Sequence, residues 1–249
     1  MPFSGTTSLV TLLIVWGLSS ELLQTDVFPG PLVVFTSLSR EALSGELWVH
    51  LSATLGRVLA AFGLAWVVGV VIGVLLGRSD AMDRWFWPWV NVFLNMPALV
   101  VIVICYLGLG MTELAAVLAV VVNKAPLIAV NVRDGVRQFE SRYEEFAQVY
   151  ELSWVQKLRL VWIPQLEPFL FTALRTGLSL TWKIILVVEL LGRSSGIGFQ
   201  IHLYFQLFEV DMILAYALSF MMVMQLIEWL AVRPLEQHVQ RWRKDGQLV

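Results

Sequence analysis

The sequence predicts an all-α, polytopic membrane protein: a bundle of about six transmembrane helices with both chain ends in the cytoplasm. Of its 249 residues, 58% are hydrophobic and only 14% are charged, and the mean hydropathy is +0.74. Soluble domains usually contain about 25% charged residues. We therefore expect a single transmembrane domain over residues 1–249. The small net charge of −2 gives no indication of a nucleic-acid partner.

Six segments are apolar enough to be membrane-spanning helices, because a helix needs roughly 20 mainly apolar residues to cross the hydrocarbon. They cover about residues 6–23, 52–77, 88–108, 112–132, 168–190 and 212–232. No basic residue precedes the first segment, so it lacks the n-region of a cleavable signal and we expect it to be retained. Between the first two spans, FPGPLVVFTSLSREAL begins with turn residues and predicts a short helix along the membrane surface.

The basic residues are distributed unevenly between the two sets of loops, which predicts the orientation, since cytoplasmic loops are enriched in Lys and Arg. One set contains only Arg40 and Arg193. The other set, with both tails, contains eleven: Arg78, Arg84, Arg133, Arg137, Arg142, Lys157, Arg159, Arg233, Arg241, Arg243 and Lys244. Both ends and the loop over residues 133–167 are therefore expected in the cytoplasm. An aromatic belt on the same side is formed by Trp85, Trp87 and Trp89.

This loop contains the one long amphipathic stretch of the chain, EEFAQVYELSWVQKLRLVWIP at residues 144–164. Its first apolar stripe recurs at i, i+3 and i+4, as in a short helix, and comprises Phe146, Val149 and Tyr150. Ser153 and Gln156 form an S-x-x-Q capping box for a second helix, which we expect Pro164 to end. The pattern by itself permits two interpretations: a connector lying on the lipid headgroups, or a helix that docks in a groove of a soluble partner.

Glu145, Ala147, Ile163 and Pro164 stand at the spacing of the EAA loop, and on these residues the chain resembles the permease subunits of bacterial ABC importers. The likeness extends over about residues 50–230. Among these permeases, the chain is similar to the nitrate, taurine, aliphatic sulfonate and bicarbonate type. It is carried by GRVLAAFGLAWVVGVVIGVLLGRS (56–79), LGLGMTELAAVL (107–118) and PFLFTALRTGLSLTWKIILVVELLGRSSGIGFQI (168–201).

The resemblance implies a type I importer: a homodimer of this chain, two cytoplasmic ATPase subunits and an extracytoplasmic binding protein. The implied ATPase-coupling residues are Glu145, Phe146, Ala147, Tyr150, Glu151 and Pro164. Glu151 replaces the motif glycine, and glutamate tolerates a positive φ less well than glycine. We therefore expect either that the first helix continues through Glu151 or that the turn has shifted. The chain has no G-x-x-x-x-G-K-[ST] phosphate loop, so ATP-Mg belongs to the partner ATPase.

Three further patterns have structural interpretations. Gly69, Gly73 and Gly77 share one helix face and predict close helix packing, either within this chain or against a second copy. The segment GRSSG at residues 192–196 matches the G-x-S-x-G of hydrolases but lacks the strand that must precede it, so we expect no catalytic residue. The chain has no metal-ligand spacing and no possible intrachain disulfide: His50, His202 and His238 are isolated, and Cys105 is the only cysteine.

Lys124, Arg175 and Lys183 are cations inside predicted spans, where a charge costs about 2.5–3.5 kcal/mol by insertion scales. They are candidates for the translocation path of a small anion, the commonest substrate class of the resembling permeases. Alternatively they snorkel or pair, for example with Glu228. A glutamate at the position of Glu189 looks like a feature of the resembling permease family. The rival to the importer is a non-transport scaffold or receptor that recruits a cytoplasmic partner through residues 144–164.

Overall fold

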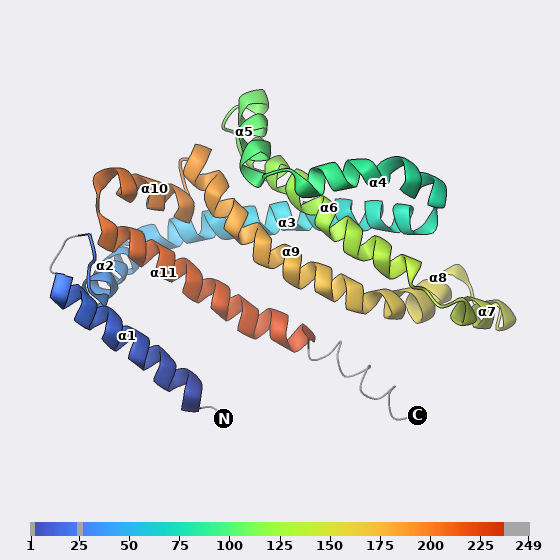
Figure 1. Cartoon of the computed structure of the whole chain (residues 1–249), viewed down its shortest axis with the longest axis horizontal. Helices are drawn as coiled ribbons and strands as arrows, with labels where there is room; N and C mark the ends of the chain where they lie inside the picture. Colours follow the sequence, from blue (N-terminus) through green and yellow to red (C-terminus); the bar gives the residue numbers. More distant parts are fainter. Residues whose placement is uncertain (1–2, 24–26, 237–249) are drawn as a thin grey trace. The chain divides into compact units, whose positions relative to one another are not determined.

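The computed structural model describes residues 3–23 and 27–236, and within them every regular element is a helix (Figure 1). The predicted all-α class is therefore confirmed. Long apolar helices fit the predicted membrane protein. Four residues used in the sequence analysis lie outside the described residues: His238, Arg241, Arg243 and Lys244.

The chain forms two compact units, which share two of its helices. The first comprises Met1–Leu55 and Val188–Leu226, and the second comprises Gly56–Val187 and Ile227–Val249. Helices α3 (Glu46–Arg78) and α9 (Ile163–Gly192) pass from one unit into the other. The prediction of a single domain over residues 1–249 is not tested by this division and stays a prediction.

Unit 1 contains α1 (Phe3–Leu23), α2 (Pro31–Ser44), α10 (Ile197–Leu207) and most of α11 (Val210–Ile227). α2 forms where a short helix is predicted after the first span. It begins with Pro31, whose fixed φ suits the first helical turn, and it ends at Gly45, which has a φ of 92°. Whether α2 lies along a membrane surface stays a prediction.

Unit 2 contains α4 (Asp80–Asn95), α5 (Ala98–Leu109), α6 (Glu113–Arg137), α7 (Ser141–Val149), α8 (Trp154–Lys157) and two π-helices, η1 (Leu158–Trp162) and η2 (Glu228–Val232). Its core lies between α3, α6 and α9. The buried members are Ala65, Val121, Ala125, Ile128, Val132, Val136, Leu166 and Ala173.

The described residues contain three helices long and apolar enough to span a membrane: Glu46–Arg78, Glu113–Arg137 and Val210–Glu236. The total rises to five if two bent pairs, α4 with α5 and Trp154–Gly192 with α10, each form one span. α1 contributes a shorter apolar helix, Thr7–Leu23. The predicted total of six spans and the cytoplasmic ends therefore stay predictions.

The prediction of one continuous helix over residues 88–108 is wrong. α4 ends at Asn95 and α5 begins at Ala98, with a bend of 96° between them (Figure 1). Met96 is extended, with φ −70° and ψ 126°. The cause is Pro97, because the proline ring disfavours helical backbone at the residue before it.

The prediction that Pro164 ends a helix is also wrong, since the helix continues from Trp154 to Gly192. Proline lacks an N–H and its ring clashes with the carbonyl four residues earlier. Here the π-helix η1 precedes the proline, and the Ile163 N–H donates to the Leu158 carbonyl five residues back. The same arrangement recurs at η2 before Pro234, where the Arg233 N–H donates to the Glu228 carbonyl.

Candidate functional site

The loop between α6 and α9 presents apolar side chains that the described chain leaves uncovered. Phe146 and Tyr150 of α7 are 51% and 65% exposed, and their ring centroids lie 4.3 Å apart. Val149, Trp154 and Val155 are also mostly exposed. Ala147, next to Phe146 on α7, is fully buried. The loop therefore has an inner side packed on its own chain and an outer apolar surface, which is typical of an interaction site.

Polar contacts hold this loop to α3 and to the start of the long α9 helix. The indole N–H of Trp162 donates to Oε2 of Glu144 at 3.2 Å, so η1 is attached to α7. The Arg78 guanidinium at the end of α3 lies over the Trp162 ring, 4.0 Å from its centroid. The backbone N–H of Glu140 donates to Oε1 of Gln165 at 3.0 Å. These contacts make the loop an anchored element of unit 2.

Glu151 takes the left-handed turn at the position of the motif glycine, with a φ of 46°. The Leu152 N–H donates to the Ala147 carbonyl and the Glu151 N–H to the Gln148 carbonyl, both at 3.0 Å. This is the Schellman pattern of a helix C-terminus. Both predicted alternatives are therefore wrong: α7 ends at Val149, and the turn stays in place. Its hydrogen bonds hold Glu151 in a conformation that glycine adopts more easily.

The second predicted feature of the loop, the capping box, is confirmed. The Ser153 hydroxyl accepts a hydrogen bond from the Gln156 N–H at 3.4 Å, and the Gln156 side chain accepts one from the Ser153 N–H at 2.8 Å. These two bonds satisfy backbone donors that the first turn of α8 cannot pair internally.

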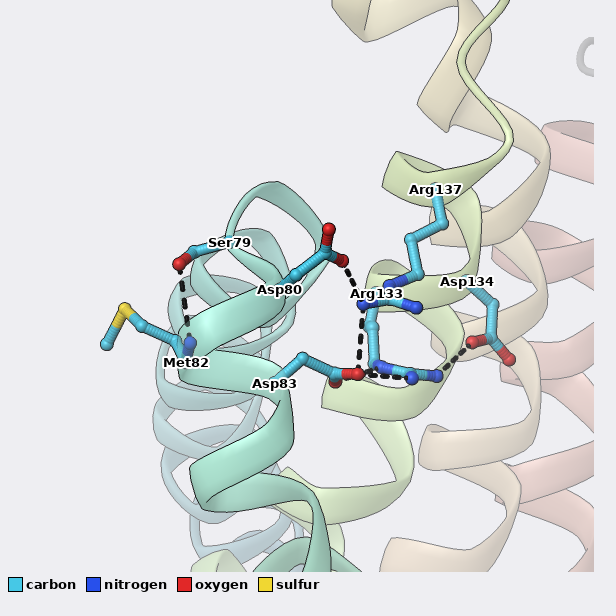
Figure 2. A network of polar contacts seen from close by, with 7 residues as sticks. All are labelled: Ser79, Asp80, Met82, Asp83, Arg133, Asp134 and Arg137. Atoms are coloured by element: carbon cyan, nitrogen blue, oxygen red, sulfur yellow. Dashed lines mark hydrogen bonds and ion pairs between the residues drawn. The ribbon is translucent and has the colours of Figure 1, made fainter.

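An ion-pair network joins the first turn of α4 to the last two turns of α6 (Figure 2). Arg133 binds Asp83 through two bonds, Nε to Oδ1 at 2.5 Å and Nη2 to Oδ2 at 2.8 Å. Arg137 contacts Asp83 and Asp80, each at 2.9 Å. The sequence analysis missed this network. Its signal was complementary spacing: aspartates at i and i+3 on one helix and arginines at i and i+4 on another.

The three cations proposed for the translocation path lie in different environments. Arg175 forms ion pairs with Glu228 at 3.6 Å and Glu236 at 2.6 Å, which is the pairing alternative that the sequence left open. Lys183 is exposed. Lys124 is 8% exposed, and its side chain has no hydrogen-bond or ion-pair partner within residues 3–23 and 27–236.

The small-residue face of α3 packs on α6 of the same chain. A Cβ at Gly69 would lie 2.8 Å from the Ala125 carbonyl oxygen, and one at Gly73 would lie 2.6 Å from the Ala129 carbonyl oxygen. At Gly77 it would lie 2.6 Å from Cβ of Val136. These distances leave no room for a side chain, so the three glycines set how closely α3 and α6 approach.

The GRSSG segment forms the turn between α9 and α10 in unit 1, and its last residue, Gly196, is buried among polar groups. Glu189 is fully buried and accepts hydrogen bonds from the Thr54 hydroxyl and the Gly198 N–H, both at 2.9 Å. The Gly196 N–H donates to Nδ1 of His50 at 3.0 Å. Gly196 has a φ of 111°, and a Cβ there would lie 2.3 Å from the Glu189 carboxyl group. His50 therefore has a structural contact that its isolation in the sequence did not reveal.

No group of His, Cys, Asp and Glu side chains in the described residues has a geometry that could hold a metal ion.

Comparison with known proteins gives a consistent picture. Residues 69–234 match the family described as "Binding-protein-dependent transport system inner membrane component". SsuC of Bacillus subtilis (strain 168), a permease assigned to aliphatic sulfonates transport, is 28% identical over 224 residues, 90% of this chain and 81% of the relative. The taurine transport system permease TauC of Escherichia coli (strain K12) is 25% identical over 247 residues, 96% of this chain and 90% of TauC.

Among solved structures, a chain of the inward-facing MetNI methionine ABC transporter superposes with a TM-score of 0.64. The match covers 78% of this chain and 95% of that chain at 20% identity. At this identity the likeness concerns the fold alone, and it places the helices described above in the fold of an ABC transporter membrane subunit.

Proposed function

Because the chain belongs to the family of inner membrane components of binding-protein-dependent transport systems, we propose that two copies of it form the translocation path of an ATP-driven importer. Each copy binds one cytoplasmic ATPase subunit, which holds ATP-Mg and hydrolyses it, and this chain has no catalytic residue of its own. An extracytoplasmic binding protein delivers the substrate.

The observation that carries this proposal is the outer surface of the α6–α9 loop. Phe146 and Tyr150 form an exposed aromatic pair on a helix whose inner side is packed on its own chain. An amphipathic helix with such a face fits a groove in a soluble partner. In this proposal Phe146 and Tyr150 enter the ATPase groove and the exposed Glu145 pairs at its edge. Ala147, Glu151 and Pro164 keep the loop in shape.

The substrate class that we propose is a small anion. Relatives named for aliphatic sulfonate, bicarbonate and nitrate transport support this choice. Lys124 is the strongest path candidate among the three cations, because a buried charge in a membrane protein is usually paired or faces a water-filled path. Arg175 already has two carboxylate partners, so its proposed role in the path is weaker than that of Lys124.

The test is co-expression with an ATPase subunit and a binding protein encoded beside this chain, followed by purification and reconstitution into proteoliposomes. We expect a complex of two permease and two ATPase copies that takes up sulfonate, taurine, nitrate or bicarbonate only when ATP and the binding protein are present. A chain that recruits a cytoplasmic partner through residues 144–164 but gives no vectorial uptake would instead be a scaffold or receptor.

A further inference from the structure

α4 is fixed to unit 2 by polar contacts near its two ends. At its first turn Asp83 binds Arg133 of α6, and beyond its last turn the Met96 carbonyl accepts a hydrogen bond from the Asn123 side chain at 3.5 Å. Between these points lies a cavity of about 430 Å³, which α3, α4 and α6 line with apolar side chains. The α4 wall consists of Met82, Phe86, Trp89, Val90 and Phe93.

Side chains that face a cavity have fewer partner atoms and make fewer van der Waals contacts than those in a close-packed core. Packing therefore fixes the position of α4 less firmly along this stretch than a close-packed core would. The Asn123 bond is long at 3.5 Å and correspondingly weak. Within the described residues the Asp83–Arg133 pair is the shortest polar contact between α4 and α6, with Arg137 adding longer ion pairs to Asp80 and Asp83.

This pair has a fixed geometry. The side chains of Asp83 and Arg133 are only 10% and 13% exposed. The guanidinium group binds both carboxylate oxygens and also lies over the Trp87 ring, 3.9 Å from its centroid. A two-bond contact of this kind sets orientation as well as distance. It holds α4 in one register against α6.

Arg133 lies on the part of α6 that leads directly into the loop. α6 ends at Arg137 and α7 begins at Ser141. The connection is tied down at both ends, since the Gln138 N–H donates to the Gly135 and Val136 carbonyls and the Glu140 N–H binds Gln165. A displacement of α7 should therefore displace the helical turn that contains Arg133 by a similar amount.

We propose that the Asp83–Arg133 pair is a positioning device that makes α4 move together with the cytoplasmic end of α6 when a partner displaces the loop. The loop is covalently joined to α6 and to α9, so these helices move with it. The ion pair makes α4 move with the loop as well. This inference rests on the proposed function for the origin of the displacement. The link between the loop and α4 does not depend on a partner, because all of its contacts lie within this chain.

An apolar contact can stabilise two packed helices as well as a buried ion pair does, but without its fixed geometry. The test variant is therefore the double change Asp83→Leu and Arg133→Met, which leaves no buried charge unpaired. The matched control is Asp80→Asn. It removes a carboxylate from the same helix pair, but one whose side chain is 84% exposed, and it leaves the Asp83–Arg133 bonds in place.

In the reconstituted complex we expect the double variant to assemble in normal yield but to transport roughly fivefold fewer substrate molecules per ATP hydrolysed, a size within the usual range of coupling between sites. The Asp80→Asn control should keep the ratio of the unaltered protein. Normal yield with an unchanged ratio in the double variant would overturn the proposal. If the double variant assembles poorly, Asp83→Asn, which keeps an acceptor oxygen for Arg133, gives the same comparison.

A second measurement separates this link from the transport function. Amide hydrogen exchange of the full chain in lipid nanodiscs needs neither ATPase nor substrate. We expect the double variant to exchange several-fold faster both in residues 80–87 and in residues 138–150, because local opening follows the loss of tertiary contacts. Faster exchange in α4 with unchanged exchange in the loop would refute the link, whatever the chain is found to transport.

Discussion

Glu151 occupies a backbone position that usually belongs to glycine. A left-handed conformation costs an L-residue about 1–2 kcal/mol, because Cβ approaches the following carbonyl oxygen. Two backbone hydrogen bonds and the caps on either side hold the turn between α7 and α8 in spite of this cost. The residue scale thus shows a strained turn at the centre of the proposed docking loop.

Glu151→Gly is expected to stabilise the turn by about 1 kcal/mol, since glycine adopts a positive φ without the steric penalty. Amide exchange of Leu152, whose N–H closes the turn, should slow by about fivefold. The control is Gln148→Gly within α7, which should have the opposite effect because glycine destabilises a helix interior by about 1 kcal/mol. Faster exchange at Leu152 in Glu151→Gly would contradict this explanation.

Lys124→Met tests the role of the buried lysine in α6. Replacing a buried cation that lacks a partner in the described chain by an apolar residue of similar length should leave assembly unchanged or improve it. If the lysine faces the path of an anion, uptake should fall by about tenfold, the effect of losing one charge-assisted hydrogen bond. Lys183→Met, at an exposed position, should lower uptake less. Yield and uptake that fall in parallel would indicate a structural role for Lys124.

At the scale of elements, backbone proximity decides how α3 packs on α6. Three glycines spaced four residues apart bring the α3 backbone against Ile128, Val132 and Val136. The two π-helices show a second element-scale feature, because each precedes a proline by two residues and lets a long helix continue.

Gly73→Leu should push α6 away from α3 and abolish most of the folded complex. Even a Cβ would lie 2.6 Å from the Ala129 carbonyl oxygen, and overpacking of this kind typically costs about 1–3 kcal/mol, or more where backbone must move. Gly63→Leu on the same helix is the control, because no atom lies within 4 Å of its added Cβ. Size-exclusion profiles of the two variants give the comparison. A monodisperse Gly73→Leu complex with full uptake would show that α6 can yield at this face.

At the scale of the whole molecule, an importer must convert ATP-driven closure of its ATPase subunits into movement of helices that face the substrate. This chain contributes a loop with an uncovered aromatic surface, a polar anchorage of that loop to α3 and α9, and an ion pair from α6 to α4. All of these features lie in unit 2.

Replacing Glu145 and Tyr150 together by alanine should uncouple the complex. Transport should fall by at least about tenfold while ATP hydrolysis becomes independent of the binding protein, since hot-spot aromatic residues often contribute about 2 kcal/mol or more to an interface. Gln148→Ala serves as the control, because this exposed residue lies on the other side of α7 from Tyr150. Parallel assays of ATPase activity and uptake check the expectation, and normal coupling in the double variant would rule out this contact.

The sequence by itself determined the helical class, most helix positions, the capping box at Ser153 and Gln156, and the loop that the chain shares with its family. These features follow from hydropathy, spacing and capping, which act over a few neighbouring residues. The sequence also contained the signal for one of its wrong predictions, because Pro97 breaks the predicted 88–108 helix. It contained no signal that the helix would continue through Pro164, since this depends on the π-helix η1.

Only the tertiary structure decided which distant residues meet. Asp83 binds Arg133 across 50 positions, Arg175 pairs with Glu228 and Glu236, and His50 accepts a bond from Gly196. Each charge or polar group in these contacts has several potential partners in the sequence, and the energy of a pair depends on burial and geometry that exist only once the helices pack. The turn at Glu151 is different, because local backbone hydrogen bonds between residues 147 and 152 offset its strain.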